Sequence, residues 1–343
     1  MTRVELASHL DTLFASDTWH WFTWHFRAGG RAGVHPFAAD VIDALMAIDA
    51  KSPGFARRMA GDLSSLRGMK KHEPHYEQLL QRLAELHIIL QLVTHEWSFS
   101  ASFDLEPTVG DGQLRNPEMR ITGGPHPLLV EVKAPSLLQH IRTRGANPVQ
   151  ISTRAVPKEQ TAKLAEELGA VTLPRDNVVK DFLVSAESKF RPFRLADPQV
   201  RTMLVIVWDD FIYEPLSALL GKGSGLLTAQ SFFRTSEGEP QVFPSVDGVL
   251  VIRHLHQLLH ATREEPFSDG CTGSFDYGAQ GTFPFKAFVQ NPAAMPVPEE
   301  LVSALHGLPP GPELGAEYIP SDLILWVEPR PIADVADGTS CLS

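Results

Sequence analysis

Residues 116–136 read NPEMRITGGPHPLLVEVKAPS, and this stretch decides the fold of the central part of the chain. Two strand-like runs, 118–122 and 127–134, flank a tight polar turn, which predicts an antiparallel hairpin. Because side chains alternate across a strand, Glu131 and Lys133 point to one face, and Val130 and Val132 point to the other. An acid and an amine side by side could form a weak surface ion pair, or they could be half of an active site.

The register of this hairpin predicts a second carboxylate beside the first. With the turn centred between Gly124 and Pro125, Glu118 falls directly across from Glu131. Cross-strand neighbours lie about 5 Å apart at Cβ, where two like charges are destabilising. A divalent cation is an economical counter-charge for such a pair, and carboxylate oxygens are ligands that Mg²⁺ prefers.

The flanking segments predict an α/β protein. A helix over about 74–95 precedes the hairpin, with a stripe of buried residues at Leu79, Leu83, Leu86, Leu90 and Val93. In this helix, Glu85 lies next to a second apolar group, so it is either partly buried with a partner or at the rim of a cleft. A strand is expected at 97–107, helices at 156–169 and 178–190, and buried strands at 202–208 and 246–252.

The order helix, three meandering strands, helix, strand resembles the PD-(D/E)XK nuclease superfamily. The matching positions are Pro117-Glu118, then Glu131-Val132-Lys133, with Glu85 in the preceding helix. The resemblance covers roughly residues 74–210 and implies a restriction-endonuclease-like core, in which a central mixed sheet is flanked by helices.

The resemblance also implies the roles of the site residues. Glu118 and Glu131 would bind Mg²⁺, for which Mn²⁺ can substitute, together with the Val132 carbonyl. Lys133 would orient or deprotonate the attacking water, and Glu85 would hold a second metal or its water. The implied activity is hydrolysis of DNA phosphodiester bonds; RNA is a second substrate class that the sequence does not exclude.

One position departs from the family pattern, because the family usually has Asp where this chain has Glu118. Asp104 and Asp111 are therefore alternative ligands. Further along, Asp209 and Asp210 follow a predicted strand and could bind a cation, although capping of the next helix explains them more simply.

Charge along the chain indicates where a polyanion would bind. The net charge of −11 argues against binding that depends on overall positive charge. Residues 137–201 nevertheless hold 11 Lys and Arg against 7 Asp and Glu, whereas residues 256–343 hold 3 against 12. On the resemblance, the helix after the site strand lies beside the metal, so four of its cations could contact the phosphate backbone: Lys180, Lys189, Arg191 and Arg194. The alternative for each is a solvated helix surface.

Three regions are expected in the 343 residues: a helical N-terminal region over 1–73, the nuclease-like core over 74–255, and an irregular, acidic, Pro/Gly-rich C-terminal region over 256–343. The aromatic run WHWFTWHF at 19–26 predicts a core or interface helix, through which the chain could bind a second copy or a partner protein.

The expected compartment is the cytoplasm. The chain has two cysteines, far apart and without a CxxC motif, which fits a reducing compartment. The N-terminus lacks the continuous apolar segment of a signal peptide, and no apolar run approaches the length of about 18 residues that predicts a membrane span.

Two other readings remain beside the nuclease. The chain could be a catalytically inactive protein of the same fold that binds nucleic acid or protein. It could also be an unrelated cytosolic α/β protein in which Glu131 and Lys133 form a surface ion pair.

Overall fold

The fold is described by a computed structural model that places most of the chain. The described residues are 2–14, 20–26, 35–66, 73–109, 116–140, 142, 149–151, 158–169, 171–210, 213–267, 270–279, 286–310 and 325–327. The alternative ligand Asp111 lies outside these ranges, as does much of the predicted C-terminal region.

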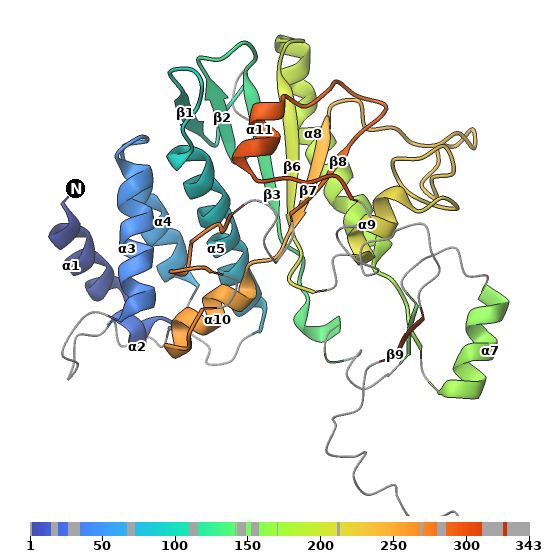
Figure 1. Cartoon of the computed structure of the whole chain (residues 1–343), viewed down its shortest axis with the longest axis horizontal. Coiled ribbons are helices and arrows are strands. Elements are labelled where there is room, and N and C mark those ends of the chain that lie inside the picture. The colour runs from blue at the N-terminus through green and yellow to red at the C-terminus, as the bar shows by residue number, and fades with distance from the viewer. Residues whose placement is uncertain are drawn as a thin grey trace, which may run out of the picture.

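A mixed six-stranded sheet, in the order β1-β2-β3-β6-β7-β8, occupies the centre of the molecule (Figure 1). Strands β3, β6 and β7 are parallel to one another, and the remaining pairs are antiparallel. The strands are β1 Ser102–Leu105, β2 Met119–Thr122, β3 Leu128–Lys133, β6 Arg201–Val207, β7 Gly248–Ile252 and β8 Ala287–Gln290. A smaller sheet has the order β5-β4-β9, formed by β5 Val171–Thr172, β4 Val149–Ile151 and β9 Leu325–Val327. The predicted α/β class is confirmed.

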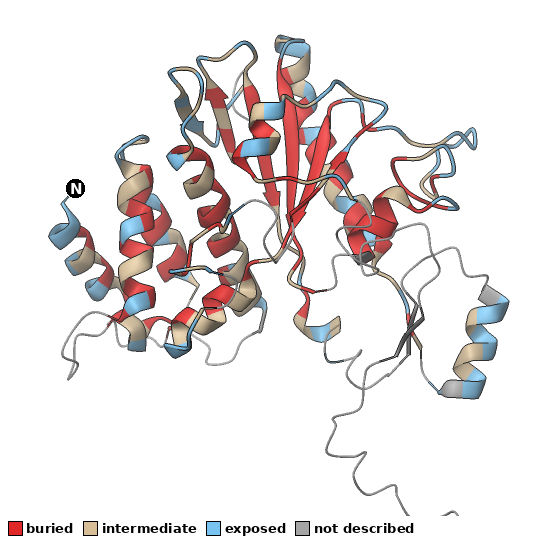
Figure 2. Cartoon of the chain, viewed as in Figure 1, coloured by how far each residue is buried: buried red, intermediate tan, exposed pale blue. Residues whose placement is uncertain are grey.

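Helices cover both faces of the large sheet. The helices in the described part of the chain are α1 Arg3–Phe14, α2 Thr23–Phe26, α3 Pro36–Asp49, α4 Phe55–Ser65, α5 Glu73–Thr94, α7 Lys158–Leu168, α8 Asp176–Ala196, α9 Tyr213–Leu220, α10 Leu255–Arg263 and α11 Glu299–Ala304. Of these, α7 lies beside the smaller sheet, where it contacts β5 (Figure 1). Helices α1–α5, α10 and α11 share a hydrophobic core with one face of the sheet, and α8 and α9 share a core with the other. Because β3, β6 and β7 are covered on both sides, they are almost entirely buried (Figure 2), as their continuous apolar sequences require.

The hairpin of β2 and β3 has the predicted register. Met119 pairs with Val130 in antiparallel orientation, so Glu118, one residue earlier, faces Glu131. The turn depends on Gly123, whose φ of +104° is in the left-handed region and where a Cβ would lie 2.1 Å from the Ser100 carbonyl oxygen. The predicted alternation along β3 also holds, since Val130 and Val132 enter one core and Leu129 the other.

The predicted regions do not pack as separate units. Helices α1–α4, from the predicted region 1–73, enter the same hydrophobic core as α5 and the sheet. Strand β8 and helix α11 belong to the predicted region 256–343, yet β8 pairs with β7 at the edge of the sheet and Leu301 is buried in the core. The C-terminal region is therefore only partly the irregular addition that its composition indicates.

The described part of the aromatic run, residues 20–26, belongs mostly to the core. Phe22 and Phe26 are buried against Phe14, while Trp24 is 58% exposed. Its use in binding a second copy or a partner stays a prediction. Among the helices that the structure describes, none combines the length and the apolar composition needed to cross a bilayer.

Candidate active site

The hairpin positions an acid and an amine on the face of the sheet that α8 covers. The Glu131 side chain is completely buried, and its Oε1 lies 2.6 Å from Lys133 Nζ. Lys133 is 23% exposed, so solvent reaches this end of the strand. Val132, whose carbonyl is the backbone ligand implied by the resemblance, lies between them with its side chain in the opposite core.

Helix α8 adds a second amine to this pair. Lys189 is buried, and its Nζ lies 2.6 Å from Oε1 and 2.8 Å from Oε2 of Glu131. The same nitrogen is 3.7 Å from Oε1 of Glu118, which is too long for a hydrogen bond. Glu131 is therefore bound by two ammonium groups, whereas Glu118 has a weaker contact with one of them.

Helix α5 runs along the end of β3 with three polar residues on one side. Glu77 accepts a hydrogen bond from the Leu138 amide at 3.2 Å, and the Gln81 side chain donates to the Ala134 carbonyl at 3.1 Å. Glu85 follows four residues later, on the same side of the helix. These contacts explain why the segment after β3 stays close to α5, and why Glu85 comes near the carboxylates of the hairpin.

Glu85 is paired with a neighbour on its own helix. Arg82 Nη1 donates to Glu85 Oε2 at 2.6 Å. Burial raises the pKa of Glu85, and the charge of Glu131 adds to this effect, while Arg82 and Lys133 oppose it. Of the two possibilities that the sequence leaves for Glu85, burial with a partner is confirmed.

Of Glu85, Glu118 and Glu131, Glu118 has the weakest contact with a cation. Burial, together with the negative charges of Glu85 and Glu131, raises its pKa from 4.5 to about 8, against the opposing effect of Lys189 and Lys133. The group is therefore mostly protonated at neutral pH unless a cation is added nearby. A divalent cation would supply the positive charge that the buried Glu118 lacks, so the donor set suits Mg²⁺ in chemistry.

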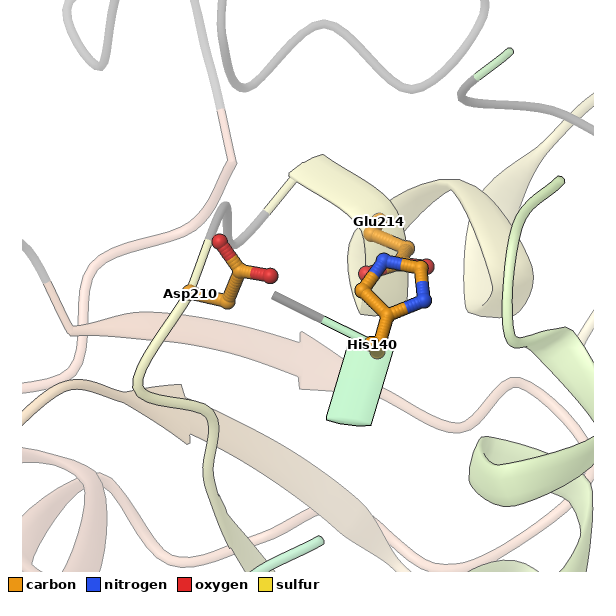
Figure 3. Close-up of side chains that lie close together, drawn as sticks. All are labelled: His140, Asp210 and Glu214. Atoms are coloured by element: carbon orange, nitrogen blue, oxygen red, sulfur yellow. The ribbon is translucent and has the colours of Figure 1, made fainter. Parts of the chain in front are cut away.

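The carboxylate oxygens of Glu85, Glu118 and Glu131 do not all lie close to one another. Among the described residues, the one group of three or more His, Cys, Asp or Glu with ligand atoms within 4.8 Å of one another is His140, Asp210 and Glu214 (Figure 3). Glu85, Glu118 and Glu131 do not meet this distance as a set. Two of them, Glu118 and Glu131, face each other across the hairpin, which is the pair that the sequence predicts as ligands.

In the group of His140, Asp210 and Glu214, the two acids are already bound by a cation, Arg175. Arg175 Nη2 lies 3.2 Å from Asp210 Oδ2 and 2.5 Å from Glu214 Oε2, and the Arg175 amide donates to Glu214 Oε1 at 2.9 Å. The guanidinium also packs over the Trp208 ring, 4.7 Å from its centroid. This arrangement joins the start of α8 to the end of β6 and to α9, and it compensates part of the negative charge of two buried acids.

Sequence reasoning missed this group, although one signal pointed to it. Asp210 and Glu214 have the i, i+4 spacing of one helix face, but His140 and Arg175 come from distant segments. Asp209, by contrast, is a cap, although not of the next helix as predicted: its Oδ1 accepts from the amides of His254 at 2.6 Å and Leu255 at 2.8 Å. The helix that it caps is α10, which is not the next one along the chain.

The four predicted phosphate contacts have different environments on α8. Lys189 lies inside the carboxylate cluster, and Arg194 Nη2 is bound to the buried Asp247 at 2.6 Å, so neither presents a free charge to a nucleic acid. Lys180 Nζ lies 3.1 Å from Asp181 and near the Phe233 ring. Arg191 is 64% exposed, with a 3.5 Å contact to Glu187, and is the most accessible of the four.

Asp104, an alternative ligand in place of Glu118, is used elsewhere. It lies on β1 opposite Arg120, whose Nη2 donates to it at 2.6 Å. This exposed cross-strand pair occupies the Asp104 carboxylate, and the structure therefore favours Glu118 over Asp104 as the partner of Glu131.

No protein-family model, curated protein or solved structure matches this chain.

Proposed function

We propose that this protein is a Mg²⁺-dependent nuclease that hydrolyses DNA phosphodiester bonds on a restriction-endonuclease-like core. The observation that carries the proposal is the hairpin register, which sets Glu118 opposite Glu131, with Lys133 bound to Glu131 at 2.6 Å. The order of α5, the β1-β2-β3 meander, α8 and the parallel strand β6 supports it.

In this proposal the chain's own residues hold the ion and orient the reactants. Glu118, Glu131 and the Val132 carbonyl would be ligands, with Glu85 holding a second ion or its water. When bound, Mg²⁺ neutralises phosphate charge and lowers the pKa of a coordinated water. The Lys133 ammonium, partly exposed at the end of β3, would orient the attacking water and donate a hydrogen bond to it or to the phosphate.

Cleavage of supercoiled plasmid and linear DNA in the presence of Mg²⁺ or Mn²⁺, with a chelator as the blank, tests this proposal. Glu118→Gln and Lys133→Ala should each lower the rate by more than about a hundredfold, because the first removes a charged metal ligand and the second removes the ammonium that orients the attacking water. The exposed Glu96 and Lys163 provide matched controls, Glu96→Gln and Lys163→Ala, which should cleave like wild type. Full activity of Lys133→Ala, or cleavage in the chelator, would contradict the assignment. An RNA substrate of the same length distinguishes the two nucleic acids.

A specific observation also favours the inactive alternative. Glu131 is already compensated by Lys133 and Lys189, so the cluster is stable as an ion network without a metal. Titration of Mn²⁺ by calorimetry separates the two functions. An active site should bind Mn²⁺ with an affinity that depends on Glu118 and Glu131, whereas an inactive binding module should show no such binding.

A further inference from the structure

Lys189 is a buried cation that the predicted metal site does not need. It contacts both carboxylate oxygens of Glu131, at 2.6 and 2.8 Å, and lies 3.7 Å from Glu118. Its side chain is 10% exposed and that of Glu131 is 0% exposed, so solvent contributes little to compensating either charge. A buried carboxylate requires such partners, since an uncompensated charge in the interior is strongly destabilising.

Lys189 and a divalent cation would use the same atoms. Mg²⁺ binds carboxylate oxygens at about 2.0–2.1 Å, and Mn²⁺ favours similar oxygen ligands. The Lys189 ammonium lies within 2.8 Å of both oxygens of Glu131 and 3.7 Å from Oε1 of Glu118, so it occupies the space between the two carboxylates. A cation bound between Glu118 and Glu131 must therefore replace at least one of these Lys189 contacts.

We propose that Lys189 is an internal competitor of the metal: it neutralises Glu131 when no ion is bound, and it gives up this carboxylate when a divalent cation enters. This inference rests on the proposed metal site and adds a regulation to it. It makes the metal affinity lower than the carboxylates alone would provide, so that occupancy depends on the free concentration of the ion.

The backbone of α8 is anchored on both sides of Lys189, which restricts the exchange to its side chain. Two residues earlier, Glu187 accepts hydrogen bonds from the Ser245 amide at 2.7 Å and the Ser245 hydroxyl at 2.9 Å. Five residues later, Arg194 is bound to Asp247 at 2.6 Å. A lysine side chain has enough rotatable bonds to move its nitrogen while the helix stays in place.

Calorimetric titration of the full chain with Mn²⁺ tests the proposal. Lys189→Met, which removes the charge at similar volume, should bind Mn²⁺ about tenfold more tightly than wild type, because no ammonium has to be displaced. Lys189→Gln, which keeps a hydrogen-bond donor, should fall between the two. Lys163→Met, an exposed lysine on α7, changes the net charge equally and should leave the affinity unchanged.

Thermal unfolding provides a second measurement that does not depend on activity. Without metal, Lys189→Met should melt below wild type, because Glu131 loses one of its two cations; saturating Mn²⁺ should reduce or reverse this difference. If Lys189→Met does not fold without metal, Lys189→Gln carries the same comparison.

The outcomes separate this inference from the proposed function. Wild-type binding of Mn²⁺ with equal or weaker binding by both Lys189 variants would overturn the competition and leave the metal site intact. Failure of wild type and both variants to bind Mn²⁺ would overturn the metal site and the competition together.

Discussion

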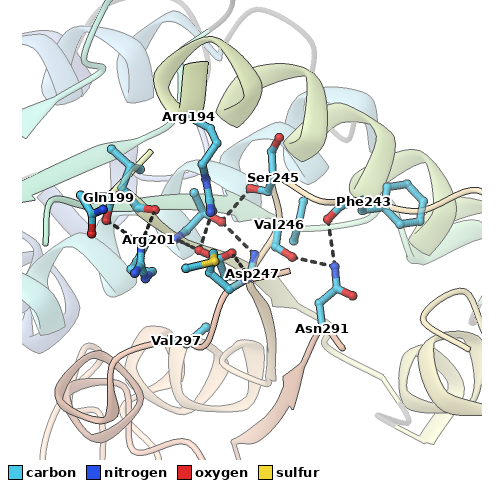
Figure 4. Close-up of polar contacts among 12 residues, drawn as sticks. Arg194, Gln199, Arg201, Phe243, Ser245, Val246, Asp247, Asn291 and Val297 are labelled. Atoms are coloured by element: carbon cyan, nitrogen blue, oxygen red, sulfur yellow. Dashed lines mark hydrogen bonds and ion pairs between the residues drawn. The ribbon is translucent and has the colours of Figure 1, made fainter. Parts of the chain in front are cut away.

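Two buried carboxylate clusters of the same sheet are compensated in different ways. Asp247, immediately before β7, is completely buried: its Oδ2 accepts from the Thr202 amide at 2.9 Å and from Arg194 at 2.6 Å, and its Oδ1 from the Met295 amide at 2.9 Å (Figure 4). Glu131 is bound by two lysines, whereas the ion-pair contact of Glu118 with the described part of the chain is the one with Lys189, at 3.7 Å.

The difference lies in the kind of partner. Amide donors belong to the backbone and cannot leave, so Asp247 is fixed as a structural junction between β6, β7 and the segment after β8. Lysine amines are at the ends of flexible side chains and can be replaced by another cation. A buried acid that is bound by backbone amides therefore has a structural role. A buried acid that is bound by side-chain cations, and whose charge is not fully compensated, indicates a binding site.

The largest stability loss is expected at Asp247. Asp247→Asn removes the charge that compensates the partly buried Arg194 and turns an amide hydrogen toward a backbone donor, at a cost of about 3–5 kcal/mol in the free energy of unfolding. Urea unfolding measures this loss. The comparison predicts that the folded fraction of the variant still binds Mn²⁺ like wild type; weakened Mn²⁺ binding would show that the two clusters are coupled.

The pH dependence of stability sharpens the contrast at Glu118. Its pKa is raised from 4.5 to about 8 in the folded protein, so the folded state retains a proton that the unfolded state releases. Stability in the absence of metal should therefore fall as pH rises from 4.5 to 8, by at most about 1.4 kcal/mol per pH unit, with no further loss from this group above pH 8. Glu118→Gln should lack this slope, whereas Glu96→Gln should keep it. Parallel curves for wild type and Glu118→Gln from pH 5 to 9 would contradict the raised pKa.

The affinity for a divalent cation should depend on the same Glu118 carboxyl group, but it should rise with pH where the stability without metal falls. An ion needs the Glu118 carboxylate, which is protonated below its pKa of about 8. The affinity for Mn²⁺ should thus increase by up to about tenfold per pH unit below pH 8 and then level off. Calorimetry at pH 7 in two buffers with different ionisation enthalpies should detect the release of about one proton per ion. Binding without proton release would exclude Glu118 as a ligand.

The smallest effect is expected for the exposed ion pair between β1 and β2. Arg120 and Asp104 lie opposite each other on β2 and β1, with side chains 36% and 50% exposed. Arg120→Ala should change the free energy of unfolding by about 0–1 kcal/mol, because solvent screens the pair. Chemical denaturation tests this value. A loss as large as that of Asp247→Asn would remove the distinction between exposed and buried carboxylates.

Local patterns were sufficient for the hairpin and for the pair of acids on it. The alternation along β3 set its two faces, and the turn around Gly124 and Pro125 set the register, because a tight turn leaves the two strands few ways to pair. The stripe of leucines predicted α5 closely. The second apolar group on that helix left two possibilities for Glu85, burial with a partner or a place at the rim of a cleft, and the structure shows the first.

Patterns of charge were less informative than patterns of hydrophobicity. The four basic residues of α8 were predicted to contact phosphate, but Lys189 binds Glu131 and Arg194 binds Asp247. Whether a cation faces solvent or an acid depends on residues 53 and 58 positions away in the chain, and no local pattern contains this information. For the same reason, the sequence did not predict the group of Arg175, His140, Asp210 and Glu214.

The amino-acid sequence by itself determined the α/β class, the hairpin and the facing of Glu118 and Glu131, because these follow from periods of two and 3.6 residues and from turn geometry. Only the tertiary structure decided which cation binds each buried acid and which segments of the chain share a hydrophobic core. Those choices depend on which helix covers which face of the sheet, a property of the packed chain that no single segment encodes.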